Sequence, residues 1–223
     1  MKPLFAAAAL IFSMALPLLA GDDSPDAYPK PSPFPVSWEL KFAHSTPRRM
    51  TIVLPGDTQP TAYWYFVYSV LNQSDQAANY DPNQDKERIF YPDFVMRTQD
   101  GKLLEGNDGI HPAVFDAIKA YERNPNLEDP TQMGGKILLG QDQMRQSVAI
   151  WAEPMRRMGS FQIFVSGLWG ETAVAKDSDG NPIKDANGND ILLHKTLMMS
   201  YHVDGDATHY SPVRKVVEQF VMR

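Results

Sequence analysis

From Trp38 onward, apolar and polar residues alternate along the chain, and this alternation predicts β-strands. Residues 36–44 place their apolar side chains on one face, and residues 48–54 repeat the pattern. Residues 62–72 are apolar at nearly every position, as expected of a central strand that is covered on both faces. Further strands are predicted at 88–98, 146–154, 160–169 and 191–204. The pattern therefore predicts a mainly β chain of about seven to nine strands.

One segment, residues 111–123, has a helical period instead. Its apolar residues recur at helical spacing, at Val114, Ala117, Ile118 and Tyr121. Pro112 suits the first turn of a helix, where its missing N–H costs nothing. We therefore expect one short helix near 112–122 that crosses between sheets.

Two further segments are ambiguous. Pro92 interrupts the strand predicted at 88–98 and indicates an edge strand or a bulge, because proline cannot donate to a strand ladder. Residues 211–223 fit either a helix or a strand. We favour a final strand, since strands with one crossover helix already account for the rest of the pattern.

The beginning of the chain predicts export. Lys2, an apolar run over residues 4–19 and the small residue Ala20 are typical of a secretory signal peptide over 1–20. Residues 21–36 contain five prolines, which predict an extended leader because proline fixes φ. We expect residues 37–223 to form a single β-sandwich domain in the periplasm or the extracellular space.

Composition narrows the classes of partner and site. The chain has no cysteine, which excludes disulfides, cysteine–zinc sites and lipid anchoring through cysteine. A cysteine-free exported protein fits a bacterial envelope better than a eukaryotic secretory route. The formal net charge of −6 argues against nucleic acid and anionic lipid as partners. No transmembrane segment is expected, because a membrane span needs about 20 apolar residues.

The long apolar strand carries a resemblance. Residues 61–74, TAYWYFVYSVLNQS, resemble the aromatic strand of bacterial immunoglobulin-like sandwiches, which commonly ends in Asn and a polar turn. Residues 147–154 and 160–170 are similar to a later strand pair of such domains. The resemblance implies an immunoglobulin-like antiparallel β-sandwich over residues 37–203. Sandwiches of this kind serve adhesion, assembly and carbohydrate binding, so the fold alone does not choose a function.

Residues 176–191 repeat one eight-residue phrase, KDSDGNPI and then KDANGNDI. A calcium ion binds six to eight oxygens, and the candidates here are Asp177, Asp179, Asn181 and Asp185. Neither copy has the Gly and the Glu that a helix–loop–helix calcium loop requires at its sixth and twelfth positions. Asp-Gly and Asn-Gly are also strong reverse-turn pairs. We favour turns in a small protruding meander over a metal site.

A second acidic and histidine-containing cluster lies in residues 201–210. Its candidate metal ligands are His202, Asp204, Asp206 and His209, and zinc binds such nitrogen and carboxylate ligands. The alternative, which we favour, is a strand end followed by a polar turn. His44 and His111 are isolated along the chain and are expected in loops or caps.

Aromatic residues offer a candidate binding surface. Trp169 lies between two glycines and, if exposed, would stack on a sugar ring or anchor a protein partner. Tyr63 and Tyr65 would line an outer sheet face in the same way. We favour core packing for all three, because side chains of this kind are commonly buried.

These patterns together predict an exported, non-catalytic binding or structural module of the bacterial cell envelope, with a protein or a glycan as partner. The chain has no G-x-S-x-G or H-E-x-x-H motif of the common hydrolases. One alternative is a calcium- or zinc-dependent domain built on residues 177–190 or 202–209. The other is a carbohydrate-binding or carbohydrate-active protein. No cofactor is expected apart from the calcium ion of the first alternative.

Overall fold

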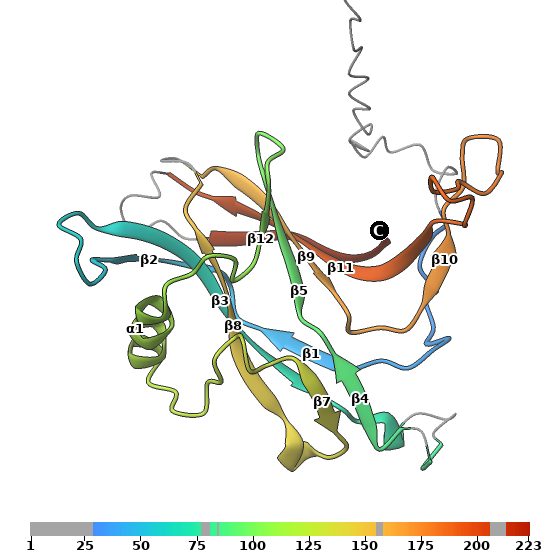
Figure 1. The fold of residues 1–223 in the computed structure, drawn as a ribbon, viewed down its shortest axis with the longest axis horizontal. Helices are drawn as coiled ribbons and strands as arrows, with labels where there is room; N and C mark the ends of the chain where they lie inside the picture. Colours follow the sequence, from blue (N-terminus) through green and yellow to red (C-terminus); the bar gives the residue numbers. More distant parts are fainter. Residues whose placement is uncertain (1–28, 77–80, 84, 155–157, 206–212) are drawn as a thin grey trace, which may run out of the picture.

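The computed structural model describes residues 29–76, 81–83, 85–154, 158–205 and 213–223. The predicted signal peptide, the first part of the leader, Asp206 and His209 lie outside these residues. The described chain is mainly β, with antiparallel sheets that pack as a sandwich and one α-helix (Figure 1). The predicted fold class is confirmed at this level, and the immunoglobulin-like character of the sandwich stays a prediction. No helix among the described residues is long and apolar enough to cross a membrane.

The first sheet is built around one long strand, β3 (Thr61–Leu71). Two short strands, β1 (Lys41–His44) and β2 (Arg48–Ile52), both pair with it, and β8 (Arg145–Ala152) is its other partner. All these pairs are antiparallel, and Trp64 faces Trp151 across the β3–β8 ladder.

The second sheet is built around β11 (Leu192–Val203). Two strands, β9 (Ser160–Ser166) and β10 (Thr172–Val174), pair one after the other with the same edge of β11. Beyond β9, the sheet continues with β5 (Asp93–Thr98), which pairs with β9, and then β6 (Leu103–Glu105), which pairs with β5. The final strand, β12 (Val213–Met222), pairs with the other edge of β11. The tail is thus a strand, as predicted.

The segment predicted as one strand over 88–98 is two strands in different sheets. β4 (Glu87–Phe90) pairs with β7 (Gly135–Leu138) in a separate ladder, and β5 belongs to the second sheet. The chain leaves one ladder and enters the other at Tyr91 and Pro92. The described residues form twelve strands, more than the pattern predicted, because strands of three or four residues are too short to show a period.

The two faces of β3 contribute to two separate cores. Trp64, Phe66 and Tyr68 are buried between the two sheets. Tyr63 and Tyr65 point to the other face, where they pack against the helix α1 (Pro112–Glu122). Figure 1 shows α1 beside β3 and β8. The prediction that this strand is covered on both faces is confirmed.

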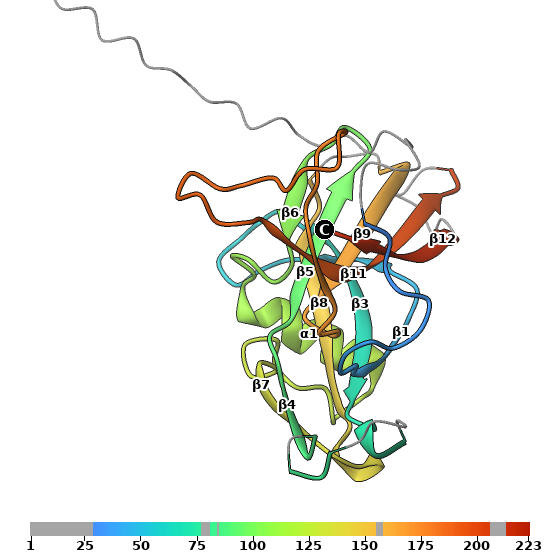
Figure 2. The ribbon, with the colours of Figure 1, turned by 90° about the vertical axis from the view of Figure 1, so that its right-hand side faces the viewer.

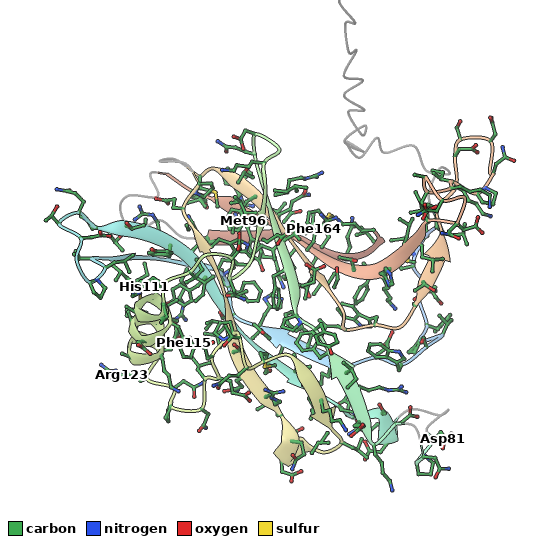
Figure 3. The ribbon with its side chains drawn as sticks, in the orientation of Figure 1. Asp81, Met96, His111, Phe115, Arg123 and Phe164 are labelled. Atoms are coloured by element: carbon green, nitrogen blue, oxygen red, sulfur yellow. The ribbon has the colours of Figure 1, made fainter. Side chains whose placement is uncertain are left out.

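The ends of α1 follow from its sequence. His111 caps the start, because its Nδ1 accepts a hydrogen bond from the backbone N–H of Ala113. Arg123 ends the helix in the left-handed conformation, with φ of 52°. Figure 3 shows these two residues at opposite ends of the helix, with Phe115 between them. Phe115 is buried, whereas Tyr121, which we placed on the apolar face, is exposed.

Candidate binding cleft at the edge of the sandwich

The described end of the leader is joined to the loop of residues 167–171. The backbone N–H of Ser32 donates to Glu171 Oε1 over 2.6 Å, and the N–H of Gly170 donates to the carbonyl of Trp38 over 3.0 Å. A Cβ atom at position 170 would lie 2.3 Å from Trp38 Nε1, so only glycine allows this close approach. The glycine after Trp169 therefore allows Ser37 and Trp38, which follow the leader, to pack against this loop.

A buried lysine fixes the same region from the second sheet. The Lys195 side chain is only 5 % exposed, and its Nζ lies 3.1 Å from Glu39 Oε1 and 3.3 Å from Glu171 Oε2. The ammonium group also lies 4.8 Å from the centre of the Phe220 ring. Lys195 thus links Glu39, the loop of residues 167–171 and β12. In the sequence, Lys195 is the one lysine of the strand predicted at 191–204, and we did not select it as a candidate residue.

Next to this lysine lies a cleft of about 940 Å³. We call it the strand-edge cleft. Its walls come from residues between Pro35 and His44 and from residues 218–220 of β12. The other lining residues are Gln73, Ser74, Gln76, Asp81, Asp85, Arg88, Trp169 and Leu197. β1 and β12 belong to different sheets and lie on the same side of the molecule (Figure 2). The cleft therefore lies where the two sheets of the sandwich meet at an open edge.

A contact between a histidine and a carboxylate joins β1 and β12 within the cleft. His44 Nε2 lies 3.5 Å from Glu218 Oε2. The His44 ring stacks on Phe42 with 5.6 Å between ring centres. The pKa of Glu218 lies below its ordinary value, chiefly because Lys215 donates a hydrogen bond to its carboxylate and also because His44 is near. His44 is thus a strand residue in the cleft and not the loop or cap residue that we expected.

The opposite wall is formed by a second charged group. Arg88 pairs with Asp85, and its guanidinium lies 5.5 Å from the centre of the Trp38 ring. Asp85 Oδ2 also accepts a hydrogen bond from the backbone N–H of Asp81 over 2.7 Å. Figure 3 shows Asp81 at the periphery of the molecule. This wall therefore places two carboxylates at the cleft.

The lining has an excess of negative charge. Its carboxylates are Glu39, Asp81, Asp85 and Glu218, and its permanent cations are Lys41 and Arg88. The lining side chains thus carry four negative and two permanent positive charges, and the partners of Glu39 and Glu218, which are Lys195 and Lys215, add two more positive charges beside the cleft.

Aromatic rings of the lining already have other protein side chains packed against them. Arg88 lies over the Trp38 ring, and Lys195 lies over the Phe220 ring. Trp169 packs edge-on against Phe220, with 4.8 Å between the ring centres and 76° between the ring planes. Protein groups thus already occupy ring faces that a sugar would need for stacking.

The three aromatic residues that we considered as binding residues are buried. Trp169 is 8 % exposed and Tyr63 and Tyr65 even less, so their fate is core packing. Tyr65 donates its phenolic hydrogen to Glu122 Oε1 over 2.7 Å, and burial is the first cause of its raised pKa. The two tyrosines line no outer face, because α1 covers them. Of the three, Trp169 alone lines the cleft.

The repeat of residues 176–191 forms two hairpin turns that project beyond β10 (Figures 1 and 2). Asp177 Oδ1 accepts hydrogen bonds from the backbone N–H groups of Asp179 and Asn181 over 3.0 and 2.8 Å. Asp185 makes the same contacts to Asn187 and Asn189. Hydrogen bonds from the Asn181 and Asn189 backbones are the first cause that lowers the pKa of Asp177 and Asp185.

These contacts give the acidic residues of the repeat a structural role. Gly180 and Gly188 take φ of 84° and 86°, the left-handed values that such turns require. The carboxylates of Asp177 and Asp185 accept hydrogen bonds from their own turns, which leaves fewer oxygens for a cation. No group of three or more His, Asp or Glu among the described residues is arranged to hold a metal ion.

The period of the repeat also closes a ring of backbone hydrogen bonds. Ile183 donates to Ala175, Ile191 donates to Ile183, and Ala175 donates to Ile191, over 2.8 to 2.9 Å. The three residues are eight positions apart, so one ring joins the two turns to the base of the β10–β11 ladder.

The second candidate metal cluster is only partly within the described residues. His202 Nδ1 lies 2.9 Å from Ser160 Oγ, and its Nε2 lies 3.5 Å from Asp204 Oδ1. Asp204 Oδ2 lies 3.7 Å from Arg214 Nε. Both ring nitrogens of His202 therefore have protein partners. Asp206 and His209, the other two candidates, lie outside the described residues.

The chain matches no protein-family model, no curated protein and no solved structure.

Proposed function

We propose that the protein is an exported, non-catalytic binding module of the bacterial cell envelope, and that the strand-edge cleft binds a basic segment of a protein partner. The observation that carries the proposal is the cleft itself, with about 940 Å³ of space and a lining in which carboxylates outnumber cations. Charge of one sign in a concave site raises the local concentration of ligands of the opposite sign.

The pairing of the carboxylates supports binding over catalysis. Glu39 contacts Lys195, Asp85 contacts Arg88, and Glu218 contacts Lys215. A carboxylate that acts as a general acid near neutral pH needs a raised pKa, whereas the pKa of Glu218 is lowered. Carboxylates that are paired in this way stay ionised near neutral pH, which suits the binding of a ligand better than proton transfer.

The aromatic residues support a protein ligand over a glycan. Sugar rings bind proteins by stacking on open aromatic faces, whereas Trp38 and Phe220 each have a cationic side chain over the ring. A polypeptide segment needs no such platform, since it also binds through backbone hydrogen bonds and charged side chains.

The proposal includes export to the bacterial envelope and an immunoglobulin-like form of the sandwich. The pattern of residues 1–20 supports export, and the absence of cysteine fits a bacterial envelope. An immunoglobulin-like sandwich over residues 37–203 would suit this role, because sandwiches of that class commonly serve adhesion and assembly.

A paired binding screen tests the proposal. The purified protein is presented to a phage-displayed library of random peptides and, separately, to a glycan array. We expect enrichment of peptides rich in Lys and Arg, weaker binding at high salt, and loss of binding in the variant Asp81→Lys.

The control is Asp116→Lys, which makes the same change of charge at an exposed position on α1, outside the cleft lining. Glycan binding that Asp81→Lys abolishes would replace the proposal by the carbohydrate alternative. Peptide binding that both variants retain would remove the cleft from the proposal.

A further inference from the structure

The last strand, β12, has one unpaired edge. Among the described residues it pairs only with β11. Residues His194 and Arg223 exchange both backbone hydrogen bonds, so they form a hydrogen-bonded pair of the ladder. Along an antiparallel ladder, such pairs alternate with pairs in which the N–H and C=O groups of both residues point away from the partner strand. The N–H and C=O groups of Glu218 and Phe220, opposite Met199 and Leu197, therefore point to the free edge.

A bulge changes this alternation in the middle of β12. Ser200 pairs with Val217, but the next residue, Tyr201, pairs with Lys215, which leaves Val216 as an extra residue. The N–H of Val203 donates to Gly159, on the β9 side of β11. The partners of Val203 and Tyr201 on β12, which are Val213 and Lys215, therefore also turn their backbone groups to the free edge.

The free edge is exposed and partly apolar. Val216 is 54 % exposed, Val217 is 39 % exposed and Phe220 is 42 % exposed. An exposed edge strand with apolar side chains is a template for pairing with another strand. Glu218 and Phe220 also line the strand-edge cleft. A strand added to this edge would therefore border the cleft.

We infer that β12 pairs with the β12 strand of a second copy of the protein, antiparallel and about a two-fold axis between Val216 and Val217. In this register Lys215 of each copy lies opposite Glu218 of the other, and Val213 lies opposite Phe220. Each contact occurs twice, as a two-fold interface requires. Opposite charges that face each other across two strands stabilise the pair.

The bulge is what makes this register possible. In a regular strand, outward-facing residues are two positions apart, so an axis between two neighbouring residues would set outward-facing against inward-facing backbone groups. The extra residue Val216 shifts the alternation by one position. Val213 and Lys215 on one side of the axis then match Phe220 and Glu218 on the other.

In this register, charged side chains of β12 meet opposite charges, apolar side chains meet apolar ones, and outward-facing backbone groups meet each other. This self-complementarity favours a second copy over an unrelated partner. The second sheets of the two copies would join into one continuous sheet, and the two clefts would lie on either side of the axis. This inference does not depend on the proposed function. It concerns the assembly of the protein, whereas the proposed function concerns the ligand of the cleft.

Charge exchange tests the inference, with molar mass measured by light scattering across a wide range of protein concentrations. We expect the unchanged protein to form dimers. Lys215→Glu would face Glu218, and Glu218→Lys would face Lys215, so each variant alone should be monomeric. An equal mixture of the two should form a heterodimer, because opposite charges then meet at both contacts. The variant with both changes should dimerise again.

The control is Lys102→Glu, an exposed residue beside β6 at the far edge of the same sheet, and this variant should still dimerise. The in-chain contact between Lys215 and Glu218 is also lost in the single variants. Thermal melts therefore check that they are folded. A protein that is monomeric at every concentration overturns the inference. A dimer that the single variants retain overturns it too.

A cross-link gives a second readout that does not depend on these charges. The chain has no cysteine, so Val216→Cys introduces a single thiol next to the proposed axis. Mild oxidation should give a disulfide-linked dimer. The control is Tyr121→Cys, at an exposed position on α1, and this variant should give little disulfide-linked dimer. Equal cross-linking of the two variants would contradict the proposed axis.

Discussion

Lys195 shows how one residue can tie together parts of the chain that are distant in sequence. It stands in the central strand of the second sheet, and its ammonium group lies near Glu39, Glu171 and the Phe220 ring. A buried charge is costly unless it is paired and hydrogen-bonded. The two glutamates therefore make the burial of this lysine possible, and the lysine in turn holds Glu39 and the loop of residues 167–171 against the second sheet.

Replacement of this lysine should destabilise the fold strongly. In Lys195→Met the carboxylate of Glu171 loses its cationic partner while it stays buried, and removal of one partner of a buried pair costs about 3 kcal/mol or more. We expect urea unfolding to show this loss, and the added change Glu171→Gln to restore much of it. The matched control is Lys184→Met, which breaks the exposed pair with Asp190 and should cost less than about 1 kcal/mol. Equal losses in the two lysine variants would contradict the role of Lys195.

The turns of the repeat give a prediction about pH. Hydrogen bonds from the turn backbones lower the pKa of Asp177 and Asp185 below the ordinary value of 3.8. The folded pKa then lies below the unfolded one. The two carboxylates therefore favour the hairpins above the unfolded pKa, and this contribution is lost as the pH falls through the folded pKa. Carboxyl resonances followed by NMR should give similar midpoints for the two residues, both below 3.8, and midpoints at or above this value would contradict the hairpin contacts.

Some of these residue roles could be predicted from sequence and others could not. Asp-Gly and Asn-Gly pairs indicate turns through local conformational preference, and the structure places turns at both. The burial of Trp169 depends on Trp38 and Phe220, which are far away in the chain. Local pattern contains no information about such neighbours. The ring of hydrogen bonds between Ala175, Ile183 and Ile191 was beyond prediction for the same reason.

At the scale of elements, the long strands followed from their side-chain period. β3 has apolar residues on both faces because one face packs against the second sheet and the other against α1. The short strands β4, β6, β7 and β10 have too few residues for a period to show. The division of residues 88–98 into two strands was also missed, because alternation continues through Pro92 while the chain changes partners.

The contact between α1 and the first sheet is open to a direct test. Ile118 is fully buried between the helix and the sheet, so Ile118→Ala should lower the free energy of unfolding by about 2 to 5 kcal/mol. Tyr121→Ala, on the exposed side of the same helix, should change it by about 0.5 kcal/mol or less. Chemical denaturation of both variants measures the difference. A small effect of Ile118→Ala would mean that α1 is not packed on the sheet.

At the scale of the whole molecule, the sandwich is open where β1 and β12 come together. The two strands belong to different sheets, and the contact between His44 and Glu218 links them through side chains. The described end of the leader lies beside this opening and adds Pro35 to its walls, and Trp38 and Glu39 follow directly after it. The same region thus holds the cleft and the free edge of β12.

The cleft could not be predicted from the sequence. Its walls come from residues between Pro35 and His44, from single residues such as Gln73, Asp85 and Arg88, and from the end of β12. Only the pairing of strands brings these segments together, and sequence pattern does not specify which strands pair. The candidate residues that we chose from local clusters of charge and aromaticity therefore lie mostly elsewhere.

The binding role of the cleft can be mapped by NMR on the isotope-labelled protein. A basic peptide enriched in the library screen is titrated into it, and the backbone amide shifts are followed. The expected result is a contiguous set of shifted amides that includes Glu39, His44, Asp85 and Phe220, with α1 unchanged. Shifts centred on α1 or on the hairpins of residues 176–191, with an unchanged cleft, would contradict the assignment of the binding site.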